Sequence, residues 1–259
     1  MSSLFKARLR HGYQAIKSIE NAKINERFKG LPKILVESVT DELEKKLVSI
    51  CPVNAIKNKP LSIDLGKCIF CGACEDFIED SPIKLTNNHI MFGFKKDQLI
   101  ITSKTDENYF KKLDLEDKDK NIQKLFKKSF KIRNVSSGGC NGCELELSAS
   151  FNVNFDAARF GIDIVASPRH ADAMLITGPI TKNMKEATIR TWEAIGEPKV
   201  CILFGSCAIS SGIFSESEEL GREILSKFNT MLYIPGCPVH PLTFISATKR
   251  LIGWGEDEP

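Results

Sequence analysis

The cysteine run CIFCGAC at residues 68–74 constrains this chain more than any other feature of its sequence. Three thiols separated by two residues each can reach neighbouring corners of one inorganic core from a single tight loop, and this spacing is typical of 4Fe-4S clusters. Such a cluster takes a soft thiolate at each of its four iron corners. The fourth cysteine is absent downstream, because Cys74 leads into the cysteine-free stretch EDFIEDSP. The missing ligand must come from elsewhere in the chain.

Cys51, which precedes Pro52, is the candidate for that fourth ligand. In proteins with two clusters, each cluster takes three thiolates from its own run and the fourth from the Cys-Pro pair of the other run. The stretch KILVESVTDELEKKLVSI before Cys51 holds no cysteine, so the other cluster of such a pair would be lost. Its loss accounts for both the retained Cys51 and the cysteine missing after Cys74. We predict one 4Fe-4S cluster held by Cys51, Cys68, Cys71 and Cys74.

Alternation of short apolar runs with helical patterns marks the C-terminal half, residues 131–259. Helical periodicity covers residues 184–196 and 241–253, between and after the apolar runs. This order predicts an α/β fold, with an open parallel sheet and helices on both of its faces. The predicted strands are KIRNV (131–135), DIVAS (163–167), AMLITG (173–178), VCILFG (200–205) and TMLYIPG (230–236).

Four of the five remaining cysteines follow these predicted strands, in the segments SGGCNGCELE, FGSCAISSG and IPGCPVHP. Because the carboxyl ends of parallel strands meet at one edge of a sheet, the three segments are expected to converge there. Glycines flank the cysteines, as expected where backbone must pack closely against an inorganic core. We predict a second 4Fe-4S site formed by Cys140, Cys143, Cys207 and Cys237. Cys201 lies inside the apolar run VCILF and is predicted to be a small buried hydrophobe.

The N-terminal half is predicted to form a smaller unit. Residues 28–103 carry the first cysteine set between β-like runs at 61–65 and 97–103, which suits a small α+β domain with one cluster. Residues 1–27 are predicted to be an amphipathic basic helix, which either packs on its own domain or docks on a partner subunit or an anionic membrane face. Residues 104–130 are dominated by charge and are predicted to be a solvated linker or helix.

Composition excludes several classes of function. The net charge of +3 arises from 36 basic and 33 acidic residues, a balance that argues against a nucleic-acid-binding protein. No apolar stretch approaches the roughly 20 residues of a membrane-spanning helix, and the N-terminus lacks the apolar core of a secretion signal, so a cytoplasmic location is expected. In that reducing compartment, nine cysteines favour cofactor binding over disulfides. No G-x-G-x-x-G or P-loop motif is present, and no complete active site is expected on this chain.

The segments GGCNGCELE, DIVASPRHADAMLITGPITKNM, GSCAISSGIF and IPGCP make residues 131–253 resemble the small subunit of NiFe hydrogenases. The resemblance is closest to the membrane-bound, energy-converting or formate-hydrogenlyase type, and weaker to the related 20 kDa cluster subunit of complex I. It implies a flavodoxin-like domain with a single 4Fe-4S cluster. Residues 28–90, with FKGLP, CPVNAI and LSIDLGKCIFCGAC, resemble the two-cluster ferredoxin subunit of such hydrogenases. The chain thus resembles a fusion of two electron-transfer subunits.

The resemblance implies an electron-transfer subunit of a membrane-associated NiFe hydrogenase complex. Two 4Fe-4S clusters would relay electrons between the active site of the large subunit and an external donor or acceptor. The implied partners are the NiFe large subunit and other subunits of the membrane complex, which would hold the chain on the inner face of the cell membrane. Two alternatives stay open: a cluster subunit of a complex I-like NADH/quinone oxidoreductase, and a non-redox scaffold with two four-cysteine zinc sites.

Polar residues near the predicted second site have two interpretations each. Arg169 and His170 follow a predicted strand and either face the large subunit or belong to a loop held by Asp172. Glu144 and Glu146 open the helix after Cys143, where carboxylates favour the helix N-terminus, and a place in a proton path is the alternative.

Overall fold

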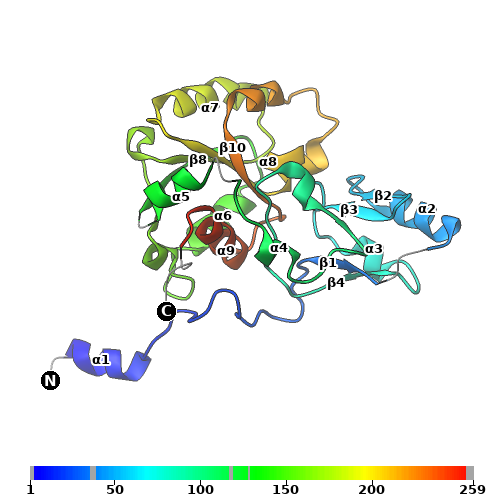
Figure 1. The fold of residues 1–259 in the computed structure, drawn as a ribbon, viewed down its shortest axis with the longest axis horizontal. Helices are drawn as coiled ribbons and strands as arrows, with labels where there is room; N and C mark the ends of the chain where they lie inside the picture. The colour runs from blue at the N-terminus through cyan, green and yellow to red at the C-terminus, as the bar shows by residue number, and fades with distance from the viewer. Residues whose placement is uncertain (1–2, 36–38, 117–118, 128, 255–259) are drawn as a thin grey trace.

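The structure of the chain is a computed structural model that describes residues 3–35, 39–116, 119–127 and 129–254 (Figure 1). Small parts of the predicted helix, domains and linker therefore lie outside the described residues, at positions 1–2, 36–38, 117–118, 128 and 255–259.

A five-stranded parallel sheet forms the C-terminal half, as predicted. Its strand order is β10-β9-β8-β6-β7, and every neighbouring pair is parallel. Counted from the first strand of this sheet, the order is 2-1-3-4-5, that of flavodoxin-like folds. The predicted flavodoxin-like α/β class is confirmed. The strands are β6 (Phe130–Ser136), β7 (Ile162–Ile164), β8 (Ala173–Thr177), β9 (Val200–Phe204) and β10 (Thr230–Ile234).

Helices cover both faces of this sheet, with α7 on one side and α6 and α9 on the other (Figure 1). Every residue of β8 and β9 is buried, as expected for central parallel strands covered on both sides. Cys201 lies in β9 with no exposed surface, as predicted. The helices are α6 (Gly142–Ala149), α7 (Lys182–Ala194), α8 (Ser206–Ser210) and α9 (Pro241–Leu251), with short 3-10 turns η3 (Ala157–Phe160), η4 (Pro168–His170), η5 (Gly212–Phe214) and η6 (Arg222–Lys227).

Small antiparallel sheets form the N-terminal half. The β-like runs predicted at 61–65 and 97–103 are confirmed as strands β3 and β5, which pair with each other. Strand β2 pairs with β3, and β1 pairs with β4 in a separate two-stranded sheet. The elements are β1 (Pro32–Ile34), α2 (Asp41–Ile50), β2 (Ile56–Lys57), β3 (Ser62–Asp64), α3 (Ala73–Asp76), β4 (Ile83–Leu85), η1 (Lys96–Leu99) and β5 (Ile100–Thr102).

Hydrogen bonds to backbone groups join the two halves of the chain. Gly93 and Tyr233 exchange two backbone hydrogen bonds, of 2.9 and 2.8 Å, so that the segment around Gly93 lies against the edge strand β10. The hydroxyl of Thr243 on α9 donates to the carbonyl of His89 at 2.8 Å. The N-terminal half is thereby fixed against the sheet rather than tethered to it by a linker alone.

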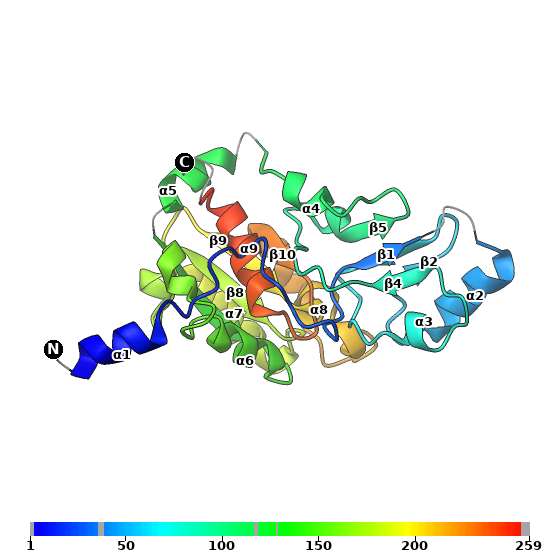
Figure 2. The same ribbon diagram turned by 90° about the horizontal axis from the view of Figure 1, so that it is seen from below.

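The N-terminal helix α1 (Ser3–His11) projects away from the rest of the molecule and buries none of its residues (Figures 1 and 2). It is shorter than the helical spacing of the sequence predicts, because Gly12 adopts a left-handed φ of 63° and its N–H bonds to the carbonyl of Arg8. This is a common way for a helix to end. The following residues are held to the body, where Arg159 donates to the Tyr13 hydroxyl at 2.7 Å.

The charged stretch 104–130 carries two short helices, α4 (Tyr109–Lys112) and α5 (Lys120–Phe126). Phe110, Leu115 and Phe126 are buried, so aromatic and aliphatic side chains together anchor this stretch to the core. It is therefore more buried than its charge predicts. Across the described residues, no helix combines the length and the apolar character needed to cross a membrane.

Candidate cluster-binding sites

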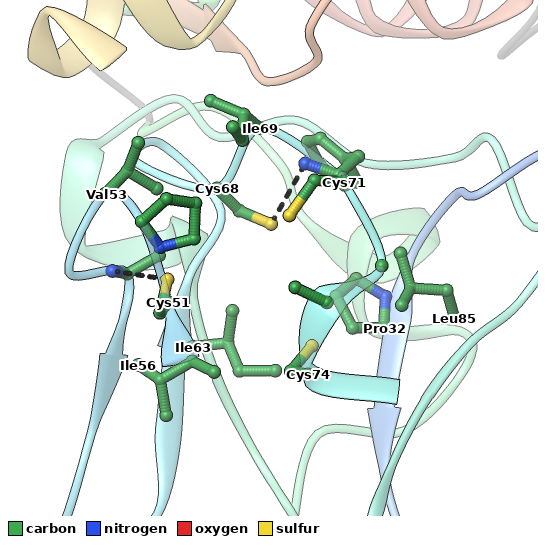
Figure 3. Close-up of a pocket in the computed structure, with 15 residues that line it drawn as sticks. Pro32, Cys51, Val53, Ile56, Ile63, Cys68, Ile69, Cys71, Cys74 and Leu85 are labelled. Carbon is green, nitrogen blue, oxygen red and sulfur yellow. Dashed lines mark hydrogen bonds between the residues drawn. The ribbon is translucent and has the colours of Figure 1, made fainter. Parts of the chain in front are cut away.

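Four thiols line one cavity in the N-terminal half (Figure 3). Cys51 lies at the C-terminal end of α2, and Cys68, Cys71 and Cys74 lie on and just after the loop that leads into α3. The structure thus brings together the four cysteines of the first predicted set. The other labelled side chains around them are apolar: Pro32, Val53, Ile56, Ile63, Ile69 and Leu85.

Backbone amides point at two of these sulfurs. The N–H of Ala55 bonds to Sγ of Cys51 at 3.2 Å, and the N–H of Phe70 bonds to Sγ of Cys68 at 3.3 Å (Figure 3). Hydrogen bonds of this kind favour the charged form of an acceptor, here the thiolate that binds metal. The loop is therefore built to stabilise negative charge on sulfur.

Burial has the opposite effect on these cysteines, because it favours the neutral thiol over the charged thiolate. It raises the pKa of Cys68 to about 12 and that of Cys74 to about 11, and the charges of neighbouring thiols add to both shifts. Metal ligation requires deprotonated cysteines, and a positively charged iron core would offset both effects. Four converging sulfurs, amide donors and an apolar lining fit a 4Fe-4S cluster.

Lys29 lies over the same loop. Its Nζ donates to the carbonyl of Cys71 at 3.2 Å and pairs with the carboxylate of Asp76 at 2.6 Å. Gly72 makes this approach possible, because a Cβ there would lie 1.9 Å from the lysine Nζ. A positive charge is thus held next to one of the candidate ligands.

The second set of cysteines lies at the carboxyl ends of three parallel strands. Cys140 and Cys143 follow β6, Cys207 lies in α8 after β9, and Cys237 follows β10. The strand order reverses between β6 and β8, and such a switch point is where flavodoxin-like folds bind their ligands. Cys140 and Cys237 are exposed, so this site reaches the surface.

The four thiols of this second set interact with one another. Burial raises the pKa of Cys207 to about 11, with further contributions from the charges of Cys237 and Cys140. Burial likewise raises the pKa of Cys143 to about 12, while the N–H of Val239 bonds to the thiol and opposes the shift. The convergence that strand order predicts for these cysteines is therefore present, with an amide donor as in the first set.

Gly205 shows how tightly the backbone packs here. Its φ is 92°, a region that residues with side chains rarely adopt, and a Cβ would lie 2.7 Å from Sγ of Cys143. The turn after β9 can therefore bring Cys207 close to Cys143 only with glycine at this position.

Arg222 is the residue at this site that the sequence did not reveal. Its guanidinium is half-buried and donates to the carbonyls of Cys207 at 3.1 Å, Ala208 at 2.9 Å and Ile209 at 2.9 Å, and also to Pro179 at 3.2 Å. It thus satisfies carbonyls of the short helix that carries Cys207. Its sequence context, EELGREILSK, reads as an ordinary charged surface and gives no signal of this role.

The remaining polar candidates lie differently. Arg169 and His170 are exposed in η4, away from the residues that line the cysteine sites, while Asp172 accepts from the N–H of Lys131 at 2.8 Å. Glu144 accepts from the hydroxyl of Thr177 at 2.6 Å.

No three His, Cys, Asp or Glu side chains of the described residues come close enough together to ligate a single metal ion.

Residues 140–251 match the family described as the NADH ubiquinone oxidoreductase 20 Kd subunit. An uncharacterized protein of Methanocaldococcus jannaschii is 37% identical over 131 residues, which span 50% of this chain and 88% of that protein. The chain belongs to this family. The match includes all four cysteines of the second set and none of the first.

Members of this family include subunits of several oxidoreductase complexes. Formate hydrogenlyase subunit 7 of Escherichia coli is 42% identical over 132 residues, or 51% of this chain and 52% of that subunit. An NADH-quinone oxidoreductase subunit of Carboxydothermus hydrogenoformans is 40% identical over 119 residues, or 44% of this chain and 66% of that subunit. The chain thus spans about half the length of the formate hydrogenlyase relative. A chain of the archaeal membrane-bound sulfane sulfur reductase matches with 31% identity and a TM-score of 0.43, over 51% of this chain and 73% of its own.

Proposed function

We propose that this chain is the electron-transfer subunit of a membrane-associated NiFe hydrogenase complex of the formate-hydrogenlyase type. The observation that carries the proposal is the grouping of eight cysteines into two sets, each gathered around its own site. Family membership supports the role, because relatives are named as subunits of oxidoreductase complexes. A probable membrane-bound hydrogenase subunit of Pyrococcus furiosus, 37% identical over 110 residues, supports the hydrogenase assignment.

Each cysteine set would hold one 4Fe-4S cluster, which supplies one-electron transfer when bound. The first set would make residues 28–103 a ferredoxin-type domain that retains one cluster, joined through residues 104–130 to the family domain at 131–259. Amide N–H groups would stabilise the thiolates, and the apolar lining of the first cavity would keep water from the core. The chain's own residues bind, orient and insulate, and they carry out no bond chemistry.

The partner that would complete the activity is the NiFe large subunit. The exposed thiols Cys140 and Cys237 lie where a neighbouring subunit can approach the second site closely. Other subunits of the complex would hold the chain on the inner face of the cell membrane, and α1 (Ser3–His11), in the N-terminal segment 1–27, would contribute a basic, exposed surface to that assembly.

A complex I-like quinone oxidoreductase is the second candidate, because some relatives carry such names. They include a subunit of the NAD(P)H-quinone oxidoreductase of Picosynechococcus, 39% identical over 110 residues. The C-x-x-C spacing of Cys140 and Cys143 favours the hydrogenase branch, since the complex I branch tends to have two adjacent cysteines there. A partner subunit with two C-x-x-C pairs, able to ligate nickel, would decide for hydrogenase.

Metal analysis of the native complex tests the proposal. Purified without oxygen, the complex is expected to contain nickel and about eight irons per copy of this chain beyond the iron of its other subunits. It should be brown, and dithionite should bleach it. Iron without nickel would favour the quinone enzyme, whereas a colourless, zinc-loaded protein would establish the scaffold and overturn both redox functions.

Lys29→Met is expected to lower the midpoint potential of the first cluster. The substitution removes a positive charge beside the carbonyl of Cys71, and cluster potentials depend on nearby charge. A redox titration followed by electron paramagnetic resonance measures the change. Lys33→Met is the matched control, because Lys33 pairs with Glu107 and does not line the cavity. Equal potentials in both variants would show that Lys29 has no electrostatic role.

A further inference from the structure

A single serine connects the two cysteine sets. Ser206 on α8 is 1% exposed, and its hydroxyl donates to the carbonyl of Cys68 at 2.6 Å. The next residue along the chain is Cys207. The hydrogen bond therefore joins a ligand of the first set to the immediate neighbour of a ligand of the second set, although the two residues are 138 positions apart.

The same serine also contacts the third ligand segment. Its N–H donates to the carbonyl of Gly236 at 3.0 Å, and its hydroxyl oxygen lies 3.2 Å from that oxygen. Gly236 precedes Cys237. A hydroxyl has one proton to donate, and the shorter distance assigns it mainly to Cys68. Ser206 thus lies at the meeting point of segments that carry Cys68, Cys207 and Cys237.

Ser210 makes a comparable contact one helical turn later, but its partner in the loop is Gly66 and not a candidate ligand. Its hydroxyl donates to the carbonyl of Gly66 at 2.6 Å and lies 3.2 Å from the carbonyl oxygen of Ser206. The loop and helix are close here as well, since a Cβ on Gly66 would lie 2.7 Å from a methyl carbon of Ile209. Both serines therefore hold the 66–68 segment against α8, while only Ser206 links groups adjacent to candidate ligands.

We propose that Ser206 is a positioning residue for electron transfer between the two clusters, with its hydrogen bond to Cys68 as the bridge along which the sites are electronically coupled. The inference rests on the proposed function. Electron tunnelling decays less steeply along covalent and hydrogen bonds than across gaps between unbonded atoms. From Cys68 the bridge runs through its carbonyl and the Ser206 hydroxyl to the backbone of Cys207. With both clusters bound, one would lose an electron and the other would gain it, so the step would need no bond change, proton or further reactant.

A second route between the sites competes with this bridge. The thiols of Cys71 and Cys237 are close enough for the charge of Cys71 to contribute to the raised pKa of Cys237, after burial and the charge of Cys140. Transfer between them would cross space rather than a chain of bonds. The bridge requires the hydroxyl of Ser206, whereas the second route does not. Replacing Ser206 therefore distinguishes the two routes.

Ser206→Ala in the intact complex tests the bridge. Flash photoreduction with freeze-quench electron paramagnetic resonance would measure the rate at which an electron passes between the clusters. We expect a rate several-fold below that of the wild type, with unchanged iron content, midpoint potentials and resonance line shapes. Ser210→Ala is the matched control and should transfer at the wild-type rate, because it removes the bond to Gly66 and a longer contact to the Ser206 carbonyl oxygen but leaves the hydrogen bond between Ser206 and Cys68 in place.

Each other outcome overturns the proposal. An unchanged rate in Ser206→Ala would assign transfer to the route between Cys71 and Cys237. Equal slowing in both variants would mean that the serines only hold the loop in place. Loss of iron from Ser206→Ala would make the residue a structural support of the site. Failure of the proposed function is distinguishable, because the wild-type complex would then lack two cluster signals.

Discussion

Replacing Cys207 by alanine is expected to abolish electron transfer to the partner subunit and to halve the iron bound by this chain, from about eight atoms to about four. Cys207 is held at the carboxyl end of β9 by α8, and no other cysteine of the described residues lies in that helix. We expect the cluster proposed for this partly exposed site to be lost when one of its four thiolates is removed. Iron analysis and hydrogen-dependent dye reduction by the purified complex measure the two effects.

The control for this prediction is Cys201→Ala. Cys201 is fully buried in β9, six positions before Cys207, and contacts no candidate site. Its replacement should leave the iron content and the activity unchanged. The resonance signal of the cluster proposed for Cys51, Cys68, Cys71 and Cys74 should survive in both variants. Wild-type hydrogen turnover in Cys207→Ala would refute the relay.

Arg222→Gln is expected to destabilise the folded protein by more than about 3 kcal/mol. The guanidinium donates to four backbone carbonyls, and burial lowers its pKa without leaving it uncharged. Glutamine is too short and has too few donors to satisfy them all, so buried carbonyls would lose their partners. For a chain of this size, the melting temperature should fall by roughly 6 °C or more. Thermal unfolding under anaerobic conditions measures the shift.

Arg190→Gln provides the comparison. Arg190 is exposed on α7 and pairs with Glu186 at 2.8 Å, one turn away. Exposed pairs of this kind contribute at most about 0.5 kcal/mol, so the melting temperature should hardly change. Similar melting temperatures for the two variants would mean that the bonds of Arg222 to the α8 carbonyls add little stability.

The sequence predicted the parallel sheet well because β8 and β9 are continuous apolar runs, AMLIT and VCILF, bounded by glycine or charged residues. It also predicted which cysteines gather. The spacing of Cys68, Cys71 and Cys74 is local, and the convergence of Cys143, Cys207 and Cys237 follows from strand order in a parallel sheet. Local spacing and sheet topology are both properties that a single sequence carries.

Other features depend on contacts that no local pattern encodes. Arg222 and Ser206 act through carbonyls that are brought to them by folding, and their neighbours in the sequence look like surface or loop residues. The N-terminal helix is shorter than the one predicted for residues 1–27, because the left-handed conformation of Gly12 ends it at His11. The charged stretch 104–130 hides Phe110 and Phe126, which its composition does not suggest.

The pairing of Gly93 with Tyr233 has a consequence for the exposed edge of the parallel sheet. An edge strand such as β10 presents unpaired amides and carbonyls along which foreign strands can add. Here the N-terminal half shields part of that edge with its own backbone. Without the N-terminal half, this part of the edge would be exposed and free to pair with another copy of the chain. The link between the two halves thus protects the sheet from aggregation and also fixes the spacing of the two cysteine sets.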